Sequence, residues 1–132
     1  MSQENVEVVR RVCAEWERGN FSTPAAFNPS IQVVWVDPIF TRRSQTSGLQ
    51  ELAQAMQEFL DAWEQGTATA ERIIDAGDRV VVIVLWRARG KASGIDLERR
   101  QGSVWTMSNG TVTRMVYYDD PAEALEAVGL SE

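Results

Sequence analysis

Residues 80–86 read VVVIVLW, and this run constrains the fold more than any other part of the sequence. β-Branched residues favour a strand, and the lack of alternation makes that strand apolar on both faces. Such a strand has to be covered by protein on both sides. The run is far shorter than the roughly 20 apolar residues that a membrane-spanning helix needs. The sequence therefore predicts a central strand of a sheet, with packing on each face.

Further strands are predicted on either side of this run. The run itself belongs to a predicted strand over residues 79–91. Asn109-Gly110 predicts a two-residue hairpin turn, because both positions tolerate positive φ. β-Branched and aromatic residues predict the remaining strands, over residues 31–36, 68–75, 95–107 and 111–119.

Four helices are predicted between and after these strands. Apolar residues recur at three- and four-residue spacing, and capping residues, prolines and glycines mark the ends. The predicted helices run from Ser2 to Gly19, from Thr23 to Asn28-Pro29, from Leu49 to Gly66, and from Asp120-Pro121 to Gly129. The order α-α-β-α-β-β-β-β-α predicts an α+β fold with helices on one face of a single sheet.

The outer face of the central strand needs a cover of its own, because helices in this order cover only the inner face. We expect the outer face to meet a second copy of the chain in a homodimer with an isologous, largely apolar interface. Trp86 is out of phase with Arg87 and is expected on this dimer face. The alternative is that the C-terminal helix covers the outer face.

Composition limits the partners of the chain. Its 132 residues predict one domain, residues 1–132, and 44% hydrophobic with 24% charged residues is typical of a globular protein. The net charge of −6 and the scattered arginines disfavour binding to nucleic acid or to anionic lipid. The first residues lack the apolar core of a signal peptide, so we expect a cytoplasmic protein.

The sequence has no histidine and a single cysteine, Cys13. An internal disulfide is therefore impossible, as are Ser-His-Asp and Cys-His nucleophile systems. A zinc or non-haem iron site would depend on carboxylates alone. We expect neither a metal nor a cofactor.

Five segments resemble SnoaL-like proteins of the nuclear transport factor 2-like superfamily, namely MSQENVEVVRRVCAEWERGN, VVWVDP, IIDAGDRVVVIV, VWTMSNGTVTR and AEALEAVGL. The similarity covers nearly the whole chain. It implies a cone-shaped, cystatin-like α+β barrel, in which three helices pack on a curved, mixed, mostly antiparallel sheet and a short C-terminal helix follows. It also implies a deep apolar cavity and, usually, a homodimer. The superfamily includes steroid isomerases, limonene epoxide hydrolases and polyketide cyclases.

Asp37 is the first candidate catalytic residue. It ends a strand in Trp35-Val36-Asp37-Pro38, so alternation places it on the same face as Val33 and Trp35. In an apolar pocket, desolvation raises the pKa of a carboxyl group and suits it to proton transfer. The resemblance implies the same role, because the matching Asp-Pro of steroid isomerases carries the general base. Alternatively, Asp-Pro forms a turn after the strand.

Three further side chains are candidates for polarising a substrate oxygen. Arg87 and Arg89 share one face of the long strand and could clamp an anionic or enolate oxygen, or be solvated where the strand leaves the core. Arg87 matches an Arg of limonene epoxide hydrolases, but Arg89 replaces their Asp, which disfavours epoxide hydrolysis. Ser103, where steroid isomerases carry a protonated Asp, can donate one hydrogen bond.

Tyr117 and Asp119 alternate with Met115 on the last predicted strand. Tyr117 matches a second catalytic carboxylate of the limonene enzymes and could donate a hydrogen bond to a ligand carbonyl, with Asp119 near the mouth of the cavity. Alternatively, Tyr117 is a core aromatic residue with a hydrated hydroxyl, and Asp119 only leads into the final helix.

The remaining candidate ligand contacts are mostly apolar or aromatic side chains that the predicted elements direct inward. Large flat side chains could shape a slot for a polycyclic ligand, or simply fill the core. Val12 also stands where steroid isomerases have a catalytic Tyr. The candidates are Val12, Trp16, Trp35, Phe40, Phe59, Trp63 and Trp105, with Arg89, Met115 and Asp119.

Three interpretations of function stay open. The first is a cofactor-independent enzyme that isomerises, cyclises or hydrates a small hydrophobic carbonyl compound, with Asp37 as the general base and Tyr117, Ser103 or Arg87 at the oxygen. The second is a non-catalytic module for a small ligand or for dimeric assembly. The third is a cavity filled by its own tryptophans.

Overall fold

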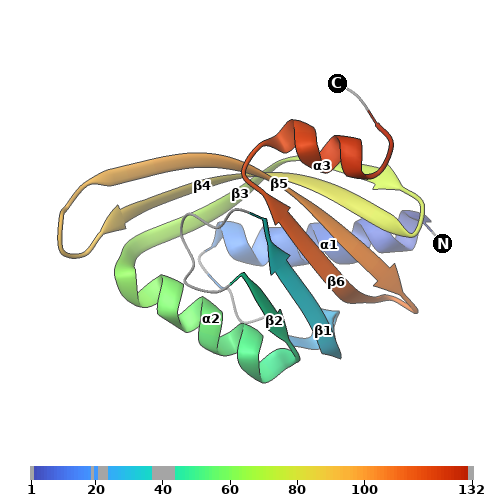
Figure 1. The fold of residues 1–132 in the computed structure, drawn as a ribbon, viewed down its shortest axis with the longest axis horizontal. Helices are drawn as coiled ribbons and strands as arrows, with labels where there is room; N and C mark the ends of the chain where they lie inside the picture. The colour runs from blue at the N-terminus through green and yellow to red at the C-terminus, as the bar shows by residue number, and fades with distance from the viewer. Residues whose placement is uncertain (1, 19, 21–23, 37–43, 131–132) are drawn as a thin grey trace.

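A six-stranded sheet organises the molecule (Figure 1). The computed structural model describes residues 2–18, 20, 24–36 and 44–130. The strand order is β2-β1-β6-β5-β4-β3, and only β1 and β6 pair in parallel. The strands are β1 (Phe27–Trp35), β2 (Gln45–Ser47), β3 (Trp63–Ala76), β4 (Arg79–Gly90), β5 (Asp96–Ser108) and β6 (Thr111–Tyr118).

The helices divide between the two faces of this sheet. Helices α1 (Ser2–Glu17) and α2 (Leu49–Ala62) pack on one face, which we call the inner face. Helix α3 (Pro121–Ala127) packs on the opposite, outer face, as Figure 1 shows. Three helices on a mixed, mostly antiparallel curved sheet are the predicted α+β fold.

Strand β4 is covered on both faces, as its sequence predicts. Val80, Val82, Val84 and Trp86 belong to the main core with α1 and α2. Val81 and Ile83 pack with Val104 of β5 against Ala124 and Leu125 of α3. The C-terminal helix therefore covers this part of the outer face, which is the alternative that the sequence left open.

Trp86 does not lie on the outer face, so the placement expected from the sequence is wrong. Its ring lies 5.5 Å from that of Phe59 and 6.3 Å from that of Trp16, and the side chain is buried in the core. Because β4 is apolar on both faces, its sequence carries no signal for which residues point inward.

Two predicted helix boundaries also differ. Helix α2 ends at Ala62 instead of Gly66, because Trp63 takes extended dihedrals and begins β3, where it pairs with Gly90. The predicted second helix is reduced to one 3-10 turn, η1 (Pro24–Ala26), and Thr23 lies outside the described residues. Asn28-Pro29 lies within β1, at a register shift that accommodates a proline.

The predicted Asn109-Gly110 turn and Asp120 cap are confirmed. Asn109 and Gly110 have φ angles of 51° and 78°, as a tight hairpin between β5 and β6 requires. The Asp120 side chain accepts a hydrogen bond from the Ala122 N–H at 3.0 Å and caps α3. Gly102 allows α3 to approach β5 closely, since a Cβ there would lie 2.7 Å from the Ala124 Cβ.

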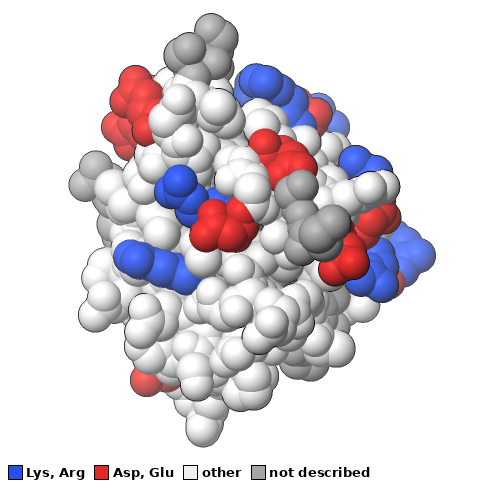
Figure 2. Space-filling model, turned by 90° about the vertical axis from the view of Figure 1, so that its right-hand side faces the viewer, with Lys and Arg blue, Asp and Glu red and all other residues white. Residues whose placement is uncertain are grey.

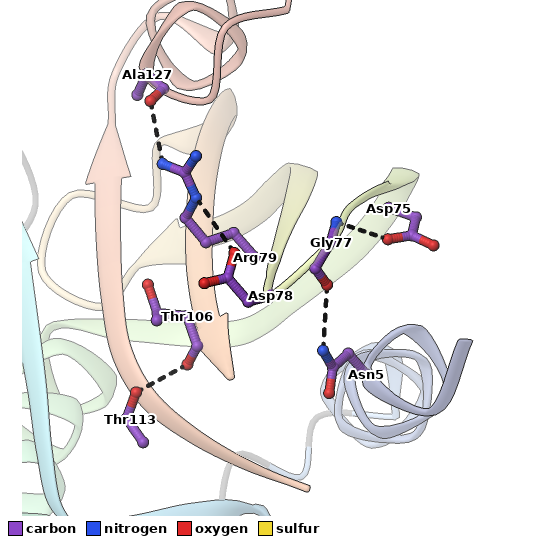
Figure 3. Close-up of polar contacts among 8 residues, drawn as sticks. All are labelled: Asn5, Asp75, Gly77, Asp78, Arg79, Thr106, Thr113 and Ala127. Atoms are coloured by element: carbon purple, nitrogen blue, oxygen red, sulfur yellow. Dashed lines mark hydrogen bonds and ion pairs between the residues drawn. The ribbon is translucent and has the colours of Figure 1, made fainter. Parts of the chain in front are cut away.

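One turn connects helices on both faces of the sheet (Figure 3). Asn5 of α1 donates from Nδ2 to the Gly77 carbonyl at 3.2 Å, and the Asp75 carboxylate accepts from the Gly77 N–H at 2.9 Å. Arg79, just after the turn, donates to the Ala127 carbonyl of α3 at 3.3 Å. The β3–β4 turn thus fixes α1 and α3 relative to the same two strands.

Charge is unevenly spread over the end of the molecule shown in Figure 2. Basic and acidic side chains gather in its upper part, towards α3, whereas the lower part, at the level of β1, β2 and α2, is almost uncharged. Among the described residues, no helix is long and apolar enough to cross a membrane.

Candidate functional site

Polar and aromatic side chains meet in one row across the inner face. The strand registers align Trp35 of β1 with Tyr117 of β6, Tyr117 with Ser103 of β5, and Ser103 with Val82 of β4. Residues paired in this way point to the same face of a sheet. Three of the predicted site residues, Trp35, Ser103 and Tyr117, are therefore neighbours.

The Ser103 side chain is buried, and its hydroxyl group is already hydrogen-bonded within the core. Its side chain is 1% exposed, its hydroxyl donates to the Val82 carbonyl at 3.3 Å, and it accepts from Nε1 of Trp105 at 2.8 Å. A serine hydroxyl has only one proton to donate, and here that proton is already used. The arrangement therefore gives Ser103 no donor for a ligand oxygen.

Tyr117 differs from Ser103 in this respect. Its ring stacks on Trp35, with 6.1 Å between centroids and 9° between planes. Within the described residues its hydroxyl makes no hydrogen bond, and the residue is buried, with 6% of its surface exposed.

The environment of Tyr117 keeps its phenol protonated. Burial, with a smaller contribution from nearby Cys13, raises the pKa of Tyr117 far above its ordinary value. A neutral phenol is a hydrogen-bond donor. Tyr117 is thus chemically suited to bind a carbonyl or enolate oxygen.

A polar cluster lies beside Tyr117 on the same face. It consists of Arg99 and Gln101 of β5 and of Asp119, the residue after β6. Gln101 donates from Nε2 to Oδ1 of Asp119 at 3.3 Å, and Nη2 of Arg99 lies 3.8 Å from Oδ2 of Asp119. Sequence reasoning named Asp119 but missed Arg99 and Gln101. Alternation back from Ser103 along β5 was the signal that could have found them.

The other candidate contacts form the wall behind this row. Trp16, Trp105 and Phe59 are buried and in ring contact with their neighbours. Val12 and Met115 are also buried in this core. Trp63 and Trp35 are only partly buried.

Arg87 and Arg89 lie away from this site. Arg87 pairs with Glu98 at 3.0 Å and Arg89 with Asp96 at 2.9 Å, and all four side chains are well exposed. They line an open groove with Ala88 and Leu97 on the β4–β5 hairpin. The inward clamp considered for the two arginines is therefore not formed, since they face solvent.

Two predicted site residues, Asp37 and Phe40, lie outside the described residues, and residues 38–48, which we expected to form the rim of the pocket, are described only from residue 44 onwards. The cavity itself and the place of Asp37 in it stay predictions. Among the described residues, no group of three or more Cys, Asp or Glu side chains is arranged to hold a metal ion.

Solved structures of other proteins have a similar fold. A 1.30 Å structure of a nuclear transport factor 2-like protein of unknown function from Burkholderia pseudomallei is similar, with a TM-score of 0.78, 19% identity, and coverage of 96% of this chain and 98% of the other. A candidate SnoaL-like polyketide cyclase from Jannaschia sp. CCS1 gives a TM-score of 0.76 and 16% identity over 99% and 95% of the two chains.

TerC, co-crystallised with polyporic acid, gives a TM-score of 0.75 and 18% identity over 95% of this chain and 98% of its own. At such identities the likeness concerns the fold alone. Comparison with curated proteins gives no match. The SnoaL-like domain family matches residues 9–115, and the chain therefore belongs to this family.

Proposed function

We propose that the inner face binds a small, planar carbonyl compound, with the Tyr117 phenol donating a hydrogen bond to the carbonyl oxygen. The observation that carries this proposal is the Tyr117 hydroxyl, which is neutral and makes no hydrogen bond among the described residues. The stacked ring of Trp35 provides an adjacent flat surface.

The proposed reaction is an isomerisation or cyclisation that begins with proton abstraction next to the carbonyl group. Asp37, two residues after Trp35 in the sequence, is the proposed general base. It takes a proton from the carbon beside the carbonyl; the electron pair of that C–H bond forms a carbon–carbon double bond, and the π pair of the C=O bond moves onto the oxygen to give an enolate. Tyr117 stabilises this enolate by its hydrogen bond. Return of the proton to another carbon completes an isomerisation.

Membership of the SnoaL-like family supports a ligand of this kind. A candidate polyketide cyclase is among the similar structures. Polyporic acid, the compound present in the TerC crystals, contains a planar quinone ring.

Binding is tested by titration with 2-methoxy-1,4-naphthoquinone, a neutral planar dicarbonyl compound, followed by calorimetry. Tyr117→Phe should weaken binding by about 3- to 10-fold, because one neutral hydrogen bond contributes roughly 0.5–1.5 kcal/mol. Tyr118→Phe is the matched control, since Tyr118 belongs to the outer-face cluster. Equal affinities for the wild type and Tyr117→Phe would contradict the role of Tyr117.

Catalysis is tested by the exchange of protons next to the carbonyl group of 2-tetralone in deuterated water, followed by proton NMR. The wild type should accelerate this exchange, and Asp37→Asn should lower the rate by about 100-fold or more, the usual contribution of a general base. Asp61→Asn on the exposed surface of α2 is the control. Undiminished exchange by Asp37→Asn would remove Asp37 from the mechanism.

A second candidate function is a non-catalytic module for a small ligand or for dimeric assembly. It is favoured by Ser103, whose only proton is used within the core, so that Ser103 does not assist Tyr117 as a second hydroxyl donor. Binding of 2-methoxy-1,4-naphthoquinone without acceleration of tetralone exchange would favour this module over an enzyme.

A further inference from the structure

We infer that Asp119 accepts a hydrogen bond from a hydroxyl group of the ligand. The substrates are then planar carbonyl compounds that also carry a hydroxyl group at the end remote from the carbonyl oxygen. This inference rests on the proposed function, because it concerns a ligand whose carbonyl oxygen lies at Tyr117. It deepens that function by naming the substrate feature that a second polar residue recognises.

The inner face becomes exposed on the side of the Tyr117 row where Asp119 lies. The next row on the opposite side consists of Val33, Met115 and Trp105, and at most 2% of each of these residues is exposed. Asp119 follows Tyr117 two residues later in the chain, and 21% of its side chain is exposed. A ligand held at Tyr117 therefore extends along the sheet towards Asp119.

Gln101 holds the Asp119 carboxylate in place. Only 8% of Gln101 is exposed, and its side-chain amide donates from Nε2 to Oδ1 of Asp119 at 3.3 Å. A buried amide is unfavourable unless it is hydrogen-bonded, so this bond ties the two side chains together. Gln101 is therefore a positioning residue, because it fixes one carboxylate oxygen and thereby the direction of the other.

The second oxygen of this carboxylate has room for a ligand donor. Oδ2 lies 3.8 Å from Nη2 of Arg99, which is beyond hydrogen-bond distance, and it accepts no hydrogen bond from the described residues. An ionised carboxylate can only accept hydrogen bonds, so the ligand group that fits Oδ2 is a donor. Arg99 keeps its place beside the carboxylate, because the ligand does not replace it.

The spacing of the two polar residues indicates where the ligand carries its hydroxyl group. Tyr117 and Asp119 are two residues apart in extended chain, a separation of about 6–7 Å. A hydroxyl group across an aromatic ring from the carbonyl group spans a similar distance, whereas a hydroxyl group next to the carbonyl group does not. The hydroxyl group is therefore expected on the far side of the ring.

The test compares two neutral probes of nearly equal shape, 6-hydroxy-1-tetralone and 6-methyl-1-tetralone. Their affinities are measured by calorimetry at about pH 6, where a phenol keeps its proton. The wild type should bind the hydroxyl probe about 5- to 30-fold more tightly, because hydrogen bonds to charged groups are the stronger ones. Asp119→Asn keeps the oxygen that Gln101 binds but replaces Oδ2 by a donor, so it should reduce the preference to about 2-fold or less.

Gln101→Leu tests the positioning role. It should lower the preference for the hydroxyl probe several fold and leave the affinity for the methyl probe unchanged, a split that a general structural defect would not produce. Asp96→Asn is the matched control, since Asp96 also pairs with an arginine, Arg89, but lies on the exposed β4–β5 hairpin. It should keep the wild-type preference. A thermal melt of each variant shows that it is folded.

A third probe separates hydrogen bonding from a general effect of polarity. In 8-hydroxy-1-tetralone the hydroxyl group donates to the carbonyl oxygen of the same molecule. The wild type should therefore bind this isomer no more tightly than the methyl probe. Equal affinities for the 6-hydroxy and 8-hydroxy isomers would contradict a hydrogen bond to Asp119.

Two further outcomes would overturn the inference, namely a preference for the 6-hydroxyl probe that survives in Asp119→Asn and the lack of any preference in the wild type. If Tyr117→Phe weakens binding of the methyl probe while the wild type shows no preference, the inference fails and the proposed function stands. If Tyr117→Phe binds both probes as tightly as the wild type, or if neither probe binds, both fail.

Discussion

At the residue scale, Ser103 and Tyr117 lie side by side on adjacent strands but differ in what their hydroxyl groups can do. The Ser103 hydroxyl connects Trp105 to the Val82 carbonyl and so satisfies a buried indole N–H. The Tyr117 ring stacks on Trp35, and its hydroxyl makes no hydrogen bond among the described residues. The Ser103 hydroxyl therefore serves stability, whereas the Tyr117 hydroxyl is the one that we propose for binding.

The buried thiol of Cys13 should make the stability of the protein sensitive to alkaline pH. Burial, and secondarily Glu17, raise the pKa of its thiol from 9.0 to about 12. Because the folded pKa lies above the unfolded one, the stabilisation is complete below about pH 9 and is lost as pH rises through about 12. The loss amounts to at most roughly 4 kcal/mol, since one pKa unit corresponds to about 1.4 kcal/mol.

Urea unfolding under reducing conditions, measured from neutral to alkaline pH, should show this decline. Cys13→Ala should flatten it over that range. Some decline should persist, because Tyr117 also has a raised pKa and acts in the same direction at higher pH. Equal slopes for the wild type and Cys13→Ala would contradict the assignment to Cys13.

Whether the sequence could predict the face of the sheet on which a residue lies depended on whether more and less buried residues alternate along its strand. Met115, Tyr117 and Asp119 alternate along a strand whose intervening residues are less buried, so their common face was predictable. Arg87 follows a run of residues that is apolar on both faces of its strand. This run has no alternation that would indicate the face on which Arg87 lies. Its outward direction follows from pairing with Glu98, a contact between strands that one strand's sequence does not encode.

At the element scale, the close approach of α3 to β5 depends on the absence of a side chain at one position. An added Cβ at Gly102 would lie 2.7 Å from the Ala124 Cβ and 2.9 Å from the Pro121 Cα. Gly102→Ala should therefore push α3 from the sheet and destabilise the protein by about 1–3 kcal/mol. Urea unfolding measures the change in the free energy of unfolding.

Gly66→Ala in β3 is the control for this prediction, because a Cβ there meets no atom within 4 Å. Its effect on the free energy of unfolding should stay within about 1 kcal/mol. A Gly102→Ala variant as stable as Gly66→Ala would show that α3 does not need the close approach.

Element boundaries were less predictable than the elements themselves. Phe59, Leu60 and Trp63 fit the apolar spacing of a helix, which is why a helix was expected to continue to Gly66. In the structure Trp63 pairs with Gly90 instead, because extending β3 completes the pairing of the long strand β4. Long-range hydrogen bonding thus overrides a local helical pattern, and the local sequence does not contain that information.

At the scale of the whole molecule, the predicted homodimer has a smaller surface to use than the sequence suggested. Helix α3 already covers Val81, Ile83 and Val104 on the outer face. The uncovered part of that face carries an ion pair between Arg100 and Glu71, with 2.9 Å between Nη2 and Oε2. A dimer through the outer face has to form around this pair.

The homodimer stays a prediction, and light scattering at micromolar concentration should give twice the 14.8 kDa mass of the chain. Arg100→Glu places like charges beside Glu71 and should shift the protein towards monomers. Arg10→Glu, on the exposed surface of α1, should not. A monomeric wild type would contradict the homodimer.

The parallel contact between β1 and β6 has a consequence for biosynthesis. Trp35 emerges from the ribosome early, but its partner Tyr117 emerges more than eighty residues later. Until then both long helices exist without the strand that joins the two halves of the sheet. A nascent chain that ends before β6 should expose its apolar core residues to chaperones. Only full-length translation brings the stacked rings of Trp35 and Tyr117 together.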